Sequence, residues 1–332
     1  MSMTTMATLT VMLVIVFVVL RLNLHKKVRK GLPGAVVSTA TAIKRTAAGL
    51  TFGIQRDVQG FDVAYLDSGG TGPVVLMLHG FAGDKDDWDG LSRHIPGKYR
   101  RVAIDLPGFG ESSRDEHQKY DTVSQVRRLR VFLDKTRILP PYHLVGSGMG
   151  GTIAAIFASV QPKAVDSLTL IEPMGVDAPE KSQVESLTSR GWSPLTASSD
   201  KEYERVLSLM MANPPSASGP LQRKRLARAV QDKALHDEIW KQLWENRPFL
   251  LEQILPEIKV RTLILWSQNS KVADPSSLKV ITQGIPDAVP VLLKGNTAHL
   301  LAVEEAKEVA QRWLQMVDPS AVKKAKSGKE KA

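Results

Sequence analysis

Short, continuous apolar runs alternate with longer stretches of helical periodicity along most of this chain. From about residue 60 onward, the runs are rich in Val, Leu and Ile, and segments with apolar positions three or four residues apart separate them. Runs of this kind are typical of strands that are buried on both faces of a parallel sheet. We therefore predict strands at residues 74–78, 101–104, 142–145, 167–171, 262–266 and 289–293.

Helical periodicity fills the spaces between several of these strands, and it predicts helices at 122–136, 152–160 and 302–317. Strands that alternate with helices indicate βαβ units, in which helices cover both faces of a mostly parallel sheet. The pattern predicts a single α/β domain, whose core is formed by residues 57–173 and 258–318.

Between the two parts of the core, residues 174–257 break the alternation. This stretch contains no convincing strand, only helical patterns at 202–211 and 221–245 that a segment rich in Pro, Ser and Gly connects. A helical insertion in an α/β sheet is expected to cover the carboxyl ends of the strands, where open sheets bind ligands. We predict a helical lid, and the alternative is an irregular second domain.

The first 20 residues carry no charge, and basic residues follow this apolar run rather than precede it. A helix of this length would just cross a hydrocarbon layer of ~30 Å, and a positive flank after the run favours a retained anchor over a cleaved signal. We predict a transmembrane anchor at 1–24 and a basic juxtamembrane segment at 25–56, with the folded domain on the cytosolic or matrix side. Endoplasmic, endosomal and mitochondrial membranes all stay open, because the acid-free segment also resembles mitochondrial targeting material.

Charge and cysteine content narrow the classes of function. The formal net charge is +10, but the excess lies at the two ends, including a basic tail at 319–332, and the body between them is close to neutral. Nucleic-acid binding requires basic residues grouped on the folded surface, so we expect no nucleic-acid partner. The chain has no cysteine, which excludes disulfides, a thiolate nucleophile and cysteine metal sites. We predict no metal and no cofactor.

Two motifs that follow predicted strands are typical of ester hydrolases. The first, LHGF at 78–81, is expected to supply one backbone N–H of an oxyanion hole, from Phe81 or Ala82. The second, DLPGFGES at 105–112, contains glycines that permit a tight turn beside such a site. Together, and in this order, the motifs predict a hydrolase-like site at the carboxyl ends of the strands.

A third motif, LVGSGMGG, corresponds to the Gly-x-Ser-x-Gly nucleophile elbow, whose central side chain is exposed above the sheet. Aligning Gly146 and Gly150 with the motif glycines places Gly148 at the centre and Ser147 one residue before it. Neighbouring side chains point in different directions at such a turn, so we expect Ser147 to lie off the line of attack. The N–H of the next residue, Met149, is the expected second donor of the oxyanion hole.

A carboxylate and a histidine are expected downstream of the elbow, because these hydrolases present their triad in the order Ser, acid, His. His299 follows the last predicted strand, where the fold presents its catalytic histidine. After the strand at 262–266, however, the loop contains Ser270 and no carboxylate before Asp274. Glu172 directly follows an earlier strand, and it either orients His299 or is a solvated carboxylate at a strand end.

These motifs make the chain similar to the membrane-anchored monoacylglycerol lipases of the α/β-hydrolase-domain family. The similarity runs from the N-terminal apolar segment through HGF at 79–81, KDDW at 85–88 and the elbow to the final His299. It implies an α/β-hydrolase fold, with a Ser-Asp-His triad that acts on acylglycerols at the cytosolic side of a membrane. Position by position, the family's nucleophile falls on Gly148, its acid on Ser270 and its histidine on His299.

Two of the three triad positions thus depart from the family. Glycine offers no nucleophile, so a covalent acyl-enzyme cannot form at Gly148, and without its acid His299 loses the partner that fixes its tautomer. The leading hypothesis is a membrane-anchored pseudo-hydrolase that binds a lipid or acylglycerol-like ligand or acts as a scaffold for membrane proteins. The alternatives are a structural accessory subunit of a membrane complex, and an ester hydrolase in which His299 activates a water.

Overall fold

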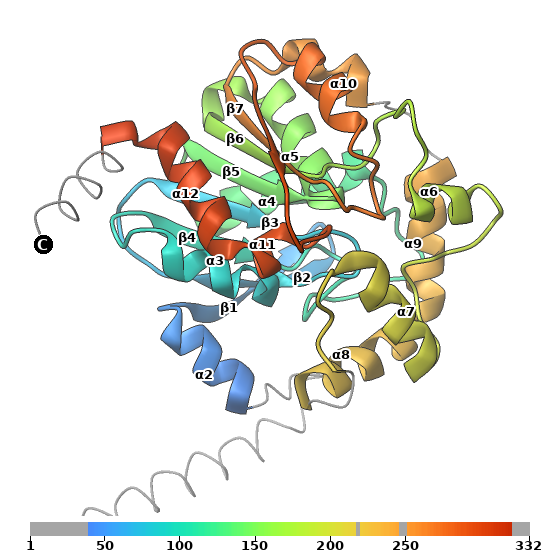
Figure 1. The fold of residues 1–332 in the computed structure, drawn as a ribbon. Helices are drawn as coiled ribbons and strands as arrows, with labels where there is room; N and C mark the ends of the chain where they lie inside the picture. Colours follow the sequence, from blue (N-terminus) through green and yellow to red (C-terminus); the bar gives the residue numbers. More distant parts are fainter. Residues whose placement is uncertain (1–38, 217–219, 246–250, 321–332) are drawn as a thin grey trace, which may run out of the picture. The chain divides into compact units, whose positions relative to one another are not determined.

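An eight-stranded sheet forms the centre of the fold (Figure 1). The computed structural model describes residues 39–216, 220–245 and 251–320. The strands follow the spatial order β1-β2-β4-β3-β5-β6-β7-β8, in which β2 pairs antiparallel with β1 and β4 and all other pairs are parallel. The strands are β1 (Thr51–Val58), β2 (Phe61–Asp67), β3 (Val74–Leu78), β4 (Arg100–Ile104), β5 (Tyr142–Ser147), β6 (Val165–Ile171), β7 (Arg261–Ser267) and β8 (Val289–Leu293).

Helices cover both faces of this sheet. Helices α4 and α5 pack together, and α5 contacts β3, β5 and β6, whereas α12 packs against α3 and β7. The α-helices of the described residues are α2 (Thr39–Ala47), α3 (Asp89–His94), α4 (Thr122–Thr136), α5 (Met149–Val160), α6 (Gln183–Thr188), α7 (Asp200–Met210), α8 (Pro220–Gln231), α9 (Lys233–Glu245), α10 (Ser277–Gly284), α11 (Leu301–Glu304) and α12 (Ala306–Val317).

Alternate side chains of the central strands enter two separate hydrophobic layers. In β3, Val74, Leu76 and Leu78 belong to the layer that contains the apolar residues of α4 and α5. Val75 and Met77 belong to the layer that contains those of α3 and α12. Because consecutive side chains of a strand point to opposite faces, a strand is apolar throughout only where both faces are covered. The continuous apolar runs in the sequence have this origin.

All six predicted strands are confirmed, with ends that differ by at most two residues, and α4 has the predicted bounds. Two long helical patterns are each divided into two helices. The pattern at 221–245 breaks between α8 and α9 at Asp232, whose buried carboxylate pairs with Arg114 at 2.6 Å. The pattern at 302–317 breaks at Glu305, which has φ −124° and ψ 35°. Periodicity alone does not reveal an interruption of one residue.

The fold begins earlier than the expected core boundary at residue 57, which falls inside β1. Strands β1 and β2 form a hairpin, and the register between them shifts between Gln55 and Val58. Three residues of this hairpin, Asp57, Gln59 and Gly60, have positive φ, a conformation that only Gly adopts without strain. A turn that uses Asp and Gln in this way gives a weak sequence signal, which is why the hairpin was not predicted.

The segment at 174–257 is helical in its described parts, as predicted. Its four α-helices, α6 to α9, lie together beside the sheet (Figure 1). The amide of Leu300 donates to the carbonyl of Met210 at 3.1 Å, so the end of α7 contacts the loop that carries His299. The insertion therefore lies over the region where the predicted site residues meet.

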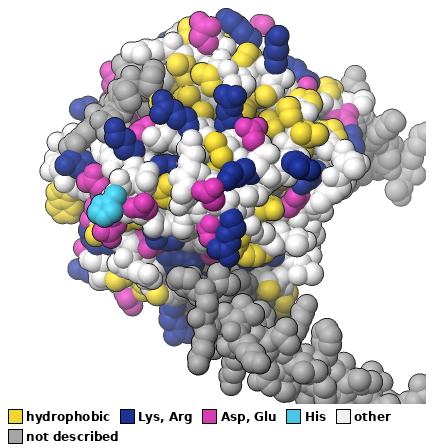
Figure 2. Space-filling view, turned by 180° about the vertical axis from the view of Figure 1, so that it is seen from behind, with side chains coloured by type: hydrophobic (Ala, Val, Ile, Leu, Met, Phe, Trp, Pro, Cys, Tyr) yellow, Lys and Arg dark blue, Asp and Glu magenta, His cyan; other side chains and the backbone are white. Residues whose placement is uncertain are grey.

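No helix among the described residues is long and apolar enough to cross a membrane. The predicted anchor at 1–24 and most of the tail at 319–332 lie outside the described residues. On the face opposite the view of Figure 1, Lys and Arg side chains are interspersed with Asp and Glu (Figure 2). The charge on this face is therefore of mixed sign.

Candidate active site

The turn between β5 and α5 has the geometry of a nucleophile elbow. At its centre, Gly148 has φ 51° and ψ −119°, a conformation that residues with side chains rarely adopt. A Cβ on Gly146 would lie 2.3 Å from the backbone oxygen of Gly150, and one on Gly150 would lie 2.2 Å from that of Leu78. These close approaches require glycine at both motif positions, which is the registration expected from the sequence.

The centre of the elbow faces the ring of His299. A Cβ built on Gly148 would lie 3.1 Å from Nε2 of His299 and 3.6 Å from the Cα of Gly80. A seryl hydroxyl on that Cβ would be within hydrogen-bonding reach of the imidazole, as in enzymes whose histidine activates a serine. Gly148 has no such group, so no side-chain nucleophile occupies the space between the elbow and the histidine.

Glu172 is the acid partner of His299. The ring Nδ1 donates to Oε2 of Glu172 at 2.7 Å, and both side chains are buried. The interpretation of Glu172 as a solvated carboxylate is wrong, because its exposed fraction is 0%. The expectation that His299 has no acid partner is also wrong, because its Nδ1 contacts this carboxylate. Parallel pairing brings the carboxyl ends of β6 and β7 to one edge of the sheet, beside the loop that follows β8.

Ser270, at the family's acid position, contacts the same carboxylate. Its hydroxyl donates to Oε2 of Glu172 at 2.5 Å, and the backbone N–H of Ser267 donates to Oε1 at 2.7 Å. With the histidine, three donors hold one buried carboxylate, as its burial requires. Asp274 does not take part, since its side chain accepts from the backbone of Ser276 and caps its own turn.

Ser147 is the last residue of β5, and its side chain is buried. Its backbone pairs with Ile171 in the parallel ladder. Among the hydrogen bonds of the described residues, none joins Ser147 to His299. The serine next to the elbow centre therefore does not substitute for the missing nucleophile in this structure, as expected.

Two backbone amides are available beside the elbow, at the positions predicted for the oxyanion hole. Met149 is the first residue of α5, and the first N–H groups of a helix have no partner within the helix. Phe81 follows Gly80, whose Cα is 3.6 Å from a Cβ on Gly148. In the described part of the chain, neither of these two amides donates to another protein group. Both remain free for a ligand.

An apolar cavity of about 60 Å³ opens beside Met149 and beneath helix α9. The volume is that of a few methylene groups, far below that of a lipid chain. Phe81 belongs to the loop of residues 79–88, which we call the oxyanion loop. Its ring packs edge-on against Trp240 of α9, with ring centroids 4.9 Å apart, so the lid contacts this loop. The lining residues include Met149, Met174, Val176, Trp240, Leu243, Trp244 and Val272.

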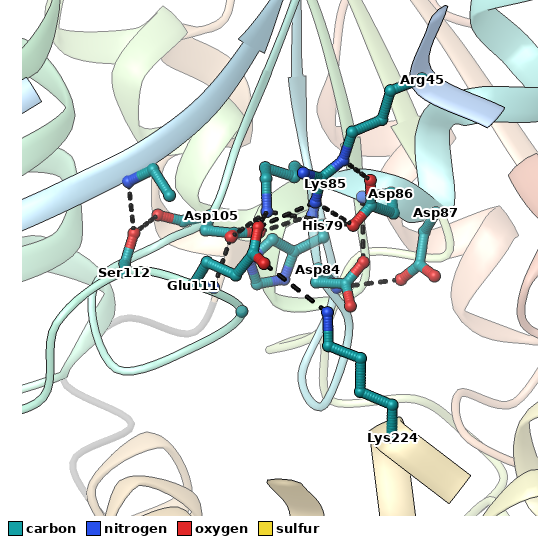
Figure 3. Close-up of polar contacts among 12 residues, drawn as sticks. Arg45, His79, Asp84, Lys85, Asp86, Asp87, Asp105, Glu111, Ser112 and Lys224 are labelled. Carbon is teal, nitrogen blue, oxygen red and sulfur yellow. Dashed lines mark hydrogen bonds and ion pairs between the residues drawn. The ribbon is translucent and has the colours of Figure 1, made fainter. Parts of the chain in front are cut away.

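A buried ionic network holds the oxyanion loop in place (Figure 3). The ammonium of Lys85 is fully buried and lies 2.7 Å from Asp105 and 2.7 Å from Glu111. The backbone N–H of Lys85 also donates to Asp105 at 2.7 Å.

His79 accepts the N–H of Leu106 on Nε2 at 3.0 Å and donates from Nδ1 to the carbonyl of Gly80. His79 therefore joins the two loops and is not a catalytic residue.

Two helices outside the core reach the same network. Arg45 of α2 pairs with Asp86 at 2.6 Å and with Glu111 at 2.8 Å. From the lid helix α8, Lys224 approaches Glu111 at 3.7 Å and points into the network in Figure 3. Arg225 of the same helix pairs with Asp84 at 3.1 Å and Asp87 at 2.8 Å. The loop that carries Phe81 is thus linked to both α2 and the lid.

The network shifts the pKa values of its members. Burial alone would raise the pKa of Glu111, but Lys85 and Arg45 outweigh it and lower the pKa to about 2. Burial alone would lower the pKa of Lys85, but Asp105, Asp86 and Glu111 raise it. Glu111 and Lys85 are therefore both charged at neutral pH. Within the described residues, no group of His, Asp or Glu is arranged to hold a metal ion.

This network was not predicted from the sequence. Lys85 belongs to the KDDW segment that carried the family resemblance, yet nothing in its local sequence indicates burial. Arg45 and Arg225 lie in segments that were expected to be juxtamembrane and lid. Only the three-dimensional fold brings such distant cations to one cluster of carboxylates. An acid-rich run next to a predicted oxyanion loop is the one signal that pointed here.

The site as a whole contains a histidine with an acid partner and two free amides, but no nucleophile. Such a dyad has the geometry to accept a proton from a bound group at Nε2. It cannot form an acyl-enzyme at Gly148. The arrangement is that of a serine hydrolase from which one functional group is missing.

Comparison with known proteins shows similarity to lipases. Lipase 1 of Psychrobacter immobilis is 27% identical over 256 residues, which cover 76% of this chain and 80% of that protein. Monoacylglycerol lipase ABHD6 of Homo sapiens is 28% identical over 252 residues, which cover 72% of this chain and 73% of that protein.

Solved structures of a phospholipase and a lipase are also similar to this chain. A membrane phospholipase A, described as a novel bacterial virulence factor, is 32% identical and superposes with a TM-score of 0.81 over 92% of this chain and 97% of its own. A putative lipase of Acinetobacter baumannii, at 23% identity, shares the fold with a TM-score of 0.78 over 86% of this chain and 97% of its own. The family model of the α/β-hydrolase fold matches residues 73–306. The chain belongs to the α/β-hydrolase fold family.

Proposed function

We propose that this chain is a membrane-anchored pseudo-hydrolase that binds a lipid or ester ligand and does not form an acyl-enzyme. The observation that carries the proposal is the position of Gly148. A Cβ there would lie 3.1 Å from Nε2 of His299, so glycine occupies the point at which a nucleophile would have to be. The rest of the site is present, which favours binding as the retained function.

The ligand class follows from the cavity and from the relatives. The cavity beside Met149 is lined mostly by apolar side chains, and the similar proteins are named as lipases, monoacylglycerol lipases and a membrane phospholipase. The uncharged run at 1–20 followed by basic residues supports a membrane anchor. An anchor would hold the site next to a source of lipids.

A fluorophosphonate probe tests the proposal, because it labels only an activated serine. We expect no labelling of the wild-type protein and labelling of Gly148→Ser, in which the hydroxyl meets His299. Gly148→Ala is the matched control, since it adds the same Cβ without the hydroxyl. Labelling of the wild-type protein, or of Gly148→Ala, would contradict the proposed role of Gly148.

The intact dyad supports a second candidate, an ester hydrolase in which His299 activates a water. Its motivating observation is the 2.7 Å contact between Nδ1 of His299 and Glu172. Sites that lack triad members retain about 10³- to 10⁴-fold acceleration over water. Turnover of a monoacylglycerol that His299→Ala abolishes, without fluorophosphonate labelling, would favour this candidate. No difference between wild type and His299→Ala would exclude it.

A further inference from the structure

The space above Gly148 has the properties of a binding site for an anion. It lies at the N-terminus of the 12-residue helix α5, where the helix dipole and free N–H groups favour negative charge. The amides of Phe81 and Met149 are both without a protein acceptor in the described chain. These two features already point to a negatively charged group in the space that a serine side chain would fill.

An independent feature is the buried imidazole of His299. Its side chain is 2% exposed, and its Nδ1 is held by Glu172. Its Nε2 lies 3.1 Å from a Cβ on Gly148 and has no partner among the described residues. A ring nitrogen without a protein partner, on a histidine whose other nitrogen is fixed, is available to hydrogen-bond a ligand or water.

The absence of a nucleophile decides which ligand fits this space best. In an active hydrolase, the oxyanion hole stabilises a charge that appears only when the nucleophile bonds to the ester carbon. Without that bond, an ester carbonyl remains neutral and gains little from the same donors. A carboxylate carries its negative charge permanently, and hydrogen bonds to charged groups are roughly twice as strong as neutral ones.

We infer that the site binds the carboxylate of a free fatty acid. One carboxylate oxygen accepts from the amides of Phe81 and Met149, and the other takes the place of the seryl oxygen and accepts from Nε2–H of His299. The alkyl chain enters the apolar cavity beneath α9. This inference rests on the proposed function, since it specifies the lipid that a non-catalytic site would hold.

The bound state has a defined proton balance. Nε2 donates to the ligand while Nδ1 donates to Glu172, so the ring carries two protons. If the His299 ring carries one proton in the free protein, the protein therefore takes up one proton when the carboxylate binds. Glu172 is the titratable group in contact with the ring, and Glu304 of α11 accepts from the neighbouring amide of Ala298 at 2.9 Å.

The small cavity sets the response to chain length. Its volume of about 60 Å³ holds only the first methylene groups, so a longer chain extends beyond the cavity or displaces helix α9. Burial of each further methylene strengthens binding about fourfold where the lid yields. Affinity that stops rising after the first few carbons would show that the lid stays closed, and the carboxylate contact would still be measured.

Calorimetry with decanoate, methyl decanoate and decanol tests the inference on the full-length protein. Decanoate is expected to bind at least about tenfold more tightly than the two neutral ligands, with uptake of up to one proton, seen as a dependence of the heat on the ionisation enthalpy of the buffer. His299→Ala is expected to lower the affinity for decanoate at least about tenfold and to remove the proton uptake. His117→Ala, at an exposed histidine, is the matched control.

A second variant keeps the test informative if His299→Ala is poorly folded. Gly148→Ala places a methyl group 3.1 Å from Nε2, in the space assigned to the carboxylate oxygen, and is expected to abolish decanoate binding. Equal or tighter binding of methyl decanoate, without proton uptake, would overturn the carboxylate inference and leave the lipid-binding proposal standing. Failure of all three ligands to bind would overturn both, whereas fluorophosphonate labelling of the wild-type protein would overturn the pseudo-hydrolase alone.

Discussion

Gly148 differs from a nucleophilic serine by a single hydroxymethyl group, and the residues around it are arranged as if that group were present. The backbone keeps φ 51° and ψ −119°, and His299 keeps a buried acid partner. Glycine adopts this conformation with little strain, whereas any residue with a Cβ stores strain there. Loss of the nucleophile therefore relieves strain at this turn.

The first prediction concerns this strain. Gly148→Ser is expected to lower the free energy of unfolding by about 1–3 kcal/mol, because the side chain must adopt a disfavoured backbone conformation. Denaturant unfolding measures the change. Gly97→Ser is a suitable control, since a Cβ at Gly97 meets no atom within 4 Å, and it should change stability by less than about 0.5 kcal/mol. A stable Gly148→Ser variant would show that the turn is not strained.

The second prediction concerns the acid. In the Gly148→Ser background, Glu172→Gln is expected to lower ester turnover by about 10³- to 10⁴-fold, because His299 loses the charge that stabilises its imidazolium. Adding the family's acid by Ser270→Asp should also lower turnover, since it places a second carboxylate where the Ser270 hydroxyl contacts Glu172 at 2.5 Å. Kinetic assays of ester hydrolysis measure both effects. An increase in turnover caused by Ser270→Asp would show that Glu172 is not the acid that supports His299.

At the scale of elements, the main feature is the carboxylate of Glu111, which three elements share. Lys85 of the oxyanion loop, Arg45 of α2 and Lys224 of α8 all approach it. Breaking a buried ion pair leaves an unpaired charge, which is strongly destabilising. The network therefore links the stability of the loop, α2 and the lid.

The third prediction is a pH dependence of this network. The pKa of Glu111 is about 2 in the folded protein, below its value in the unfolded chain, so its contribution to stability is present above about pH 4.5. It is lost as the pH falls toward 2. The difference in unfolding free energy between wild type and Glu111→Gln is therefore expected to be constant above pH 5 and to shrink below pH 4.5. A difference that grows at low pH would contradict the assignment.

The fourth prediction concerns the docking of the lid. Arg225→Met removes the cation that joins α8 to Asp84 and Asp87, so amide hydrogens of residues 220–231 should exchange faster with solvent. Arg223→Met, at an exposed position of the same helix, should leave exchange unchanged. Equal exchange in both variants would mean that packing, and not the ion pairs, holds the lid.

At the scale of the whole molecule, the fifth prediction concerns the anchor. Residues from Ser38 onward group into one unit of contacts. Removing residues 1–37 is therefore expected to leave the thermal unfolding transition in place and to move the protein from the membrane to the soluble fraction. Full-length protein that fractionates as soluble would argue against the proposed anchor.

The sequence by itself determined six of the eight strands, the helical character of the described parts of residues 174–257 and the glycine at the elbow. These follow from local rules: a strand buried on both faces is apolar throughout, and close backbone approaches demand glycine at Gly146 and Gly150. The resemblance correctly located His299 opposite the elbow. The resemblance placed the acid at position 270, but the residue there is Ser270, which has no carboxylate.

Only the tertiary structure decided what occupies the acid position in space. Glu172 and Ser270 lie 98 residues apart in the chain, yet they meet because β6 and β7 are parallel neighbours whose ends share one edge. The ionic network depends in the same way on contacts between α2, the oxyanion loop and α8. Burial and pairing of charges are properties of packed surfaces and not of any local segment, so periodicity and motifs carry little information about them.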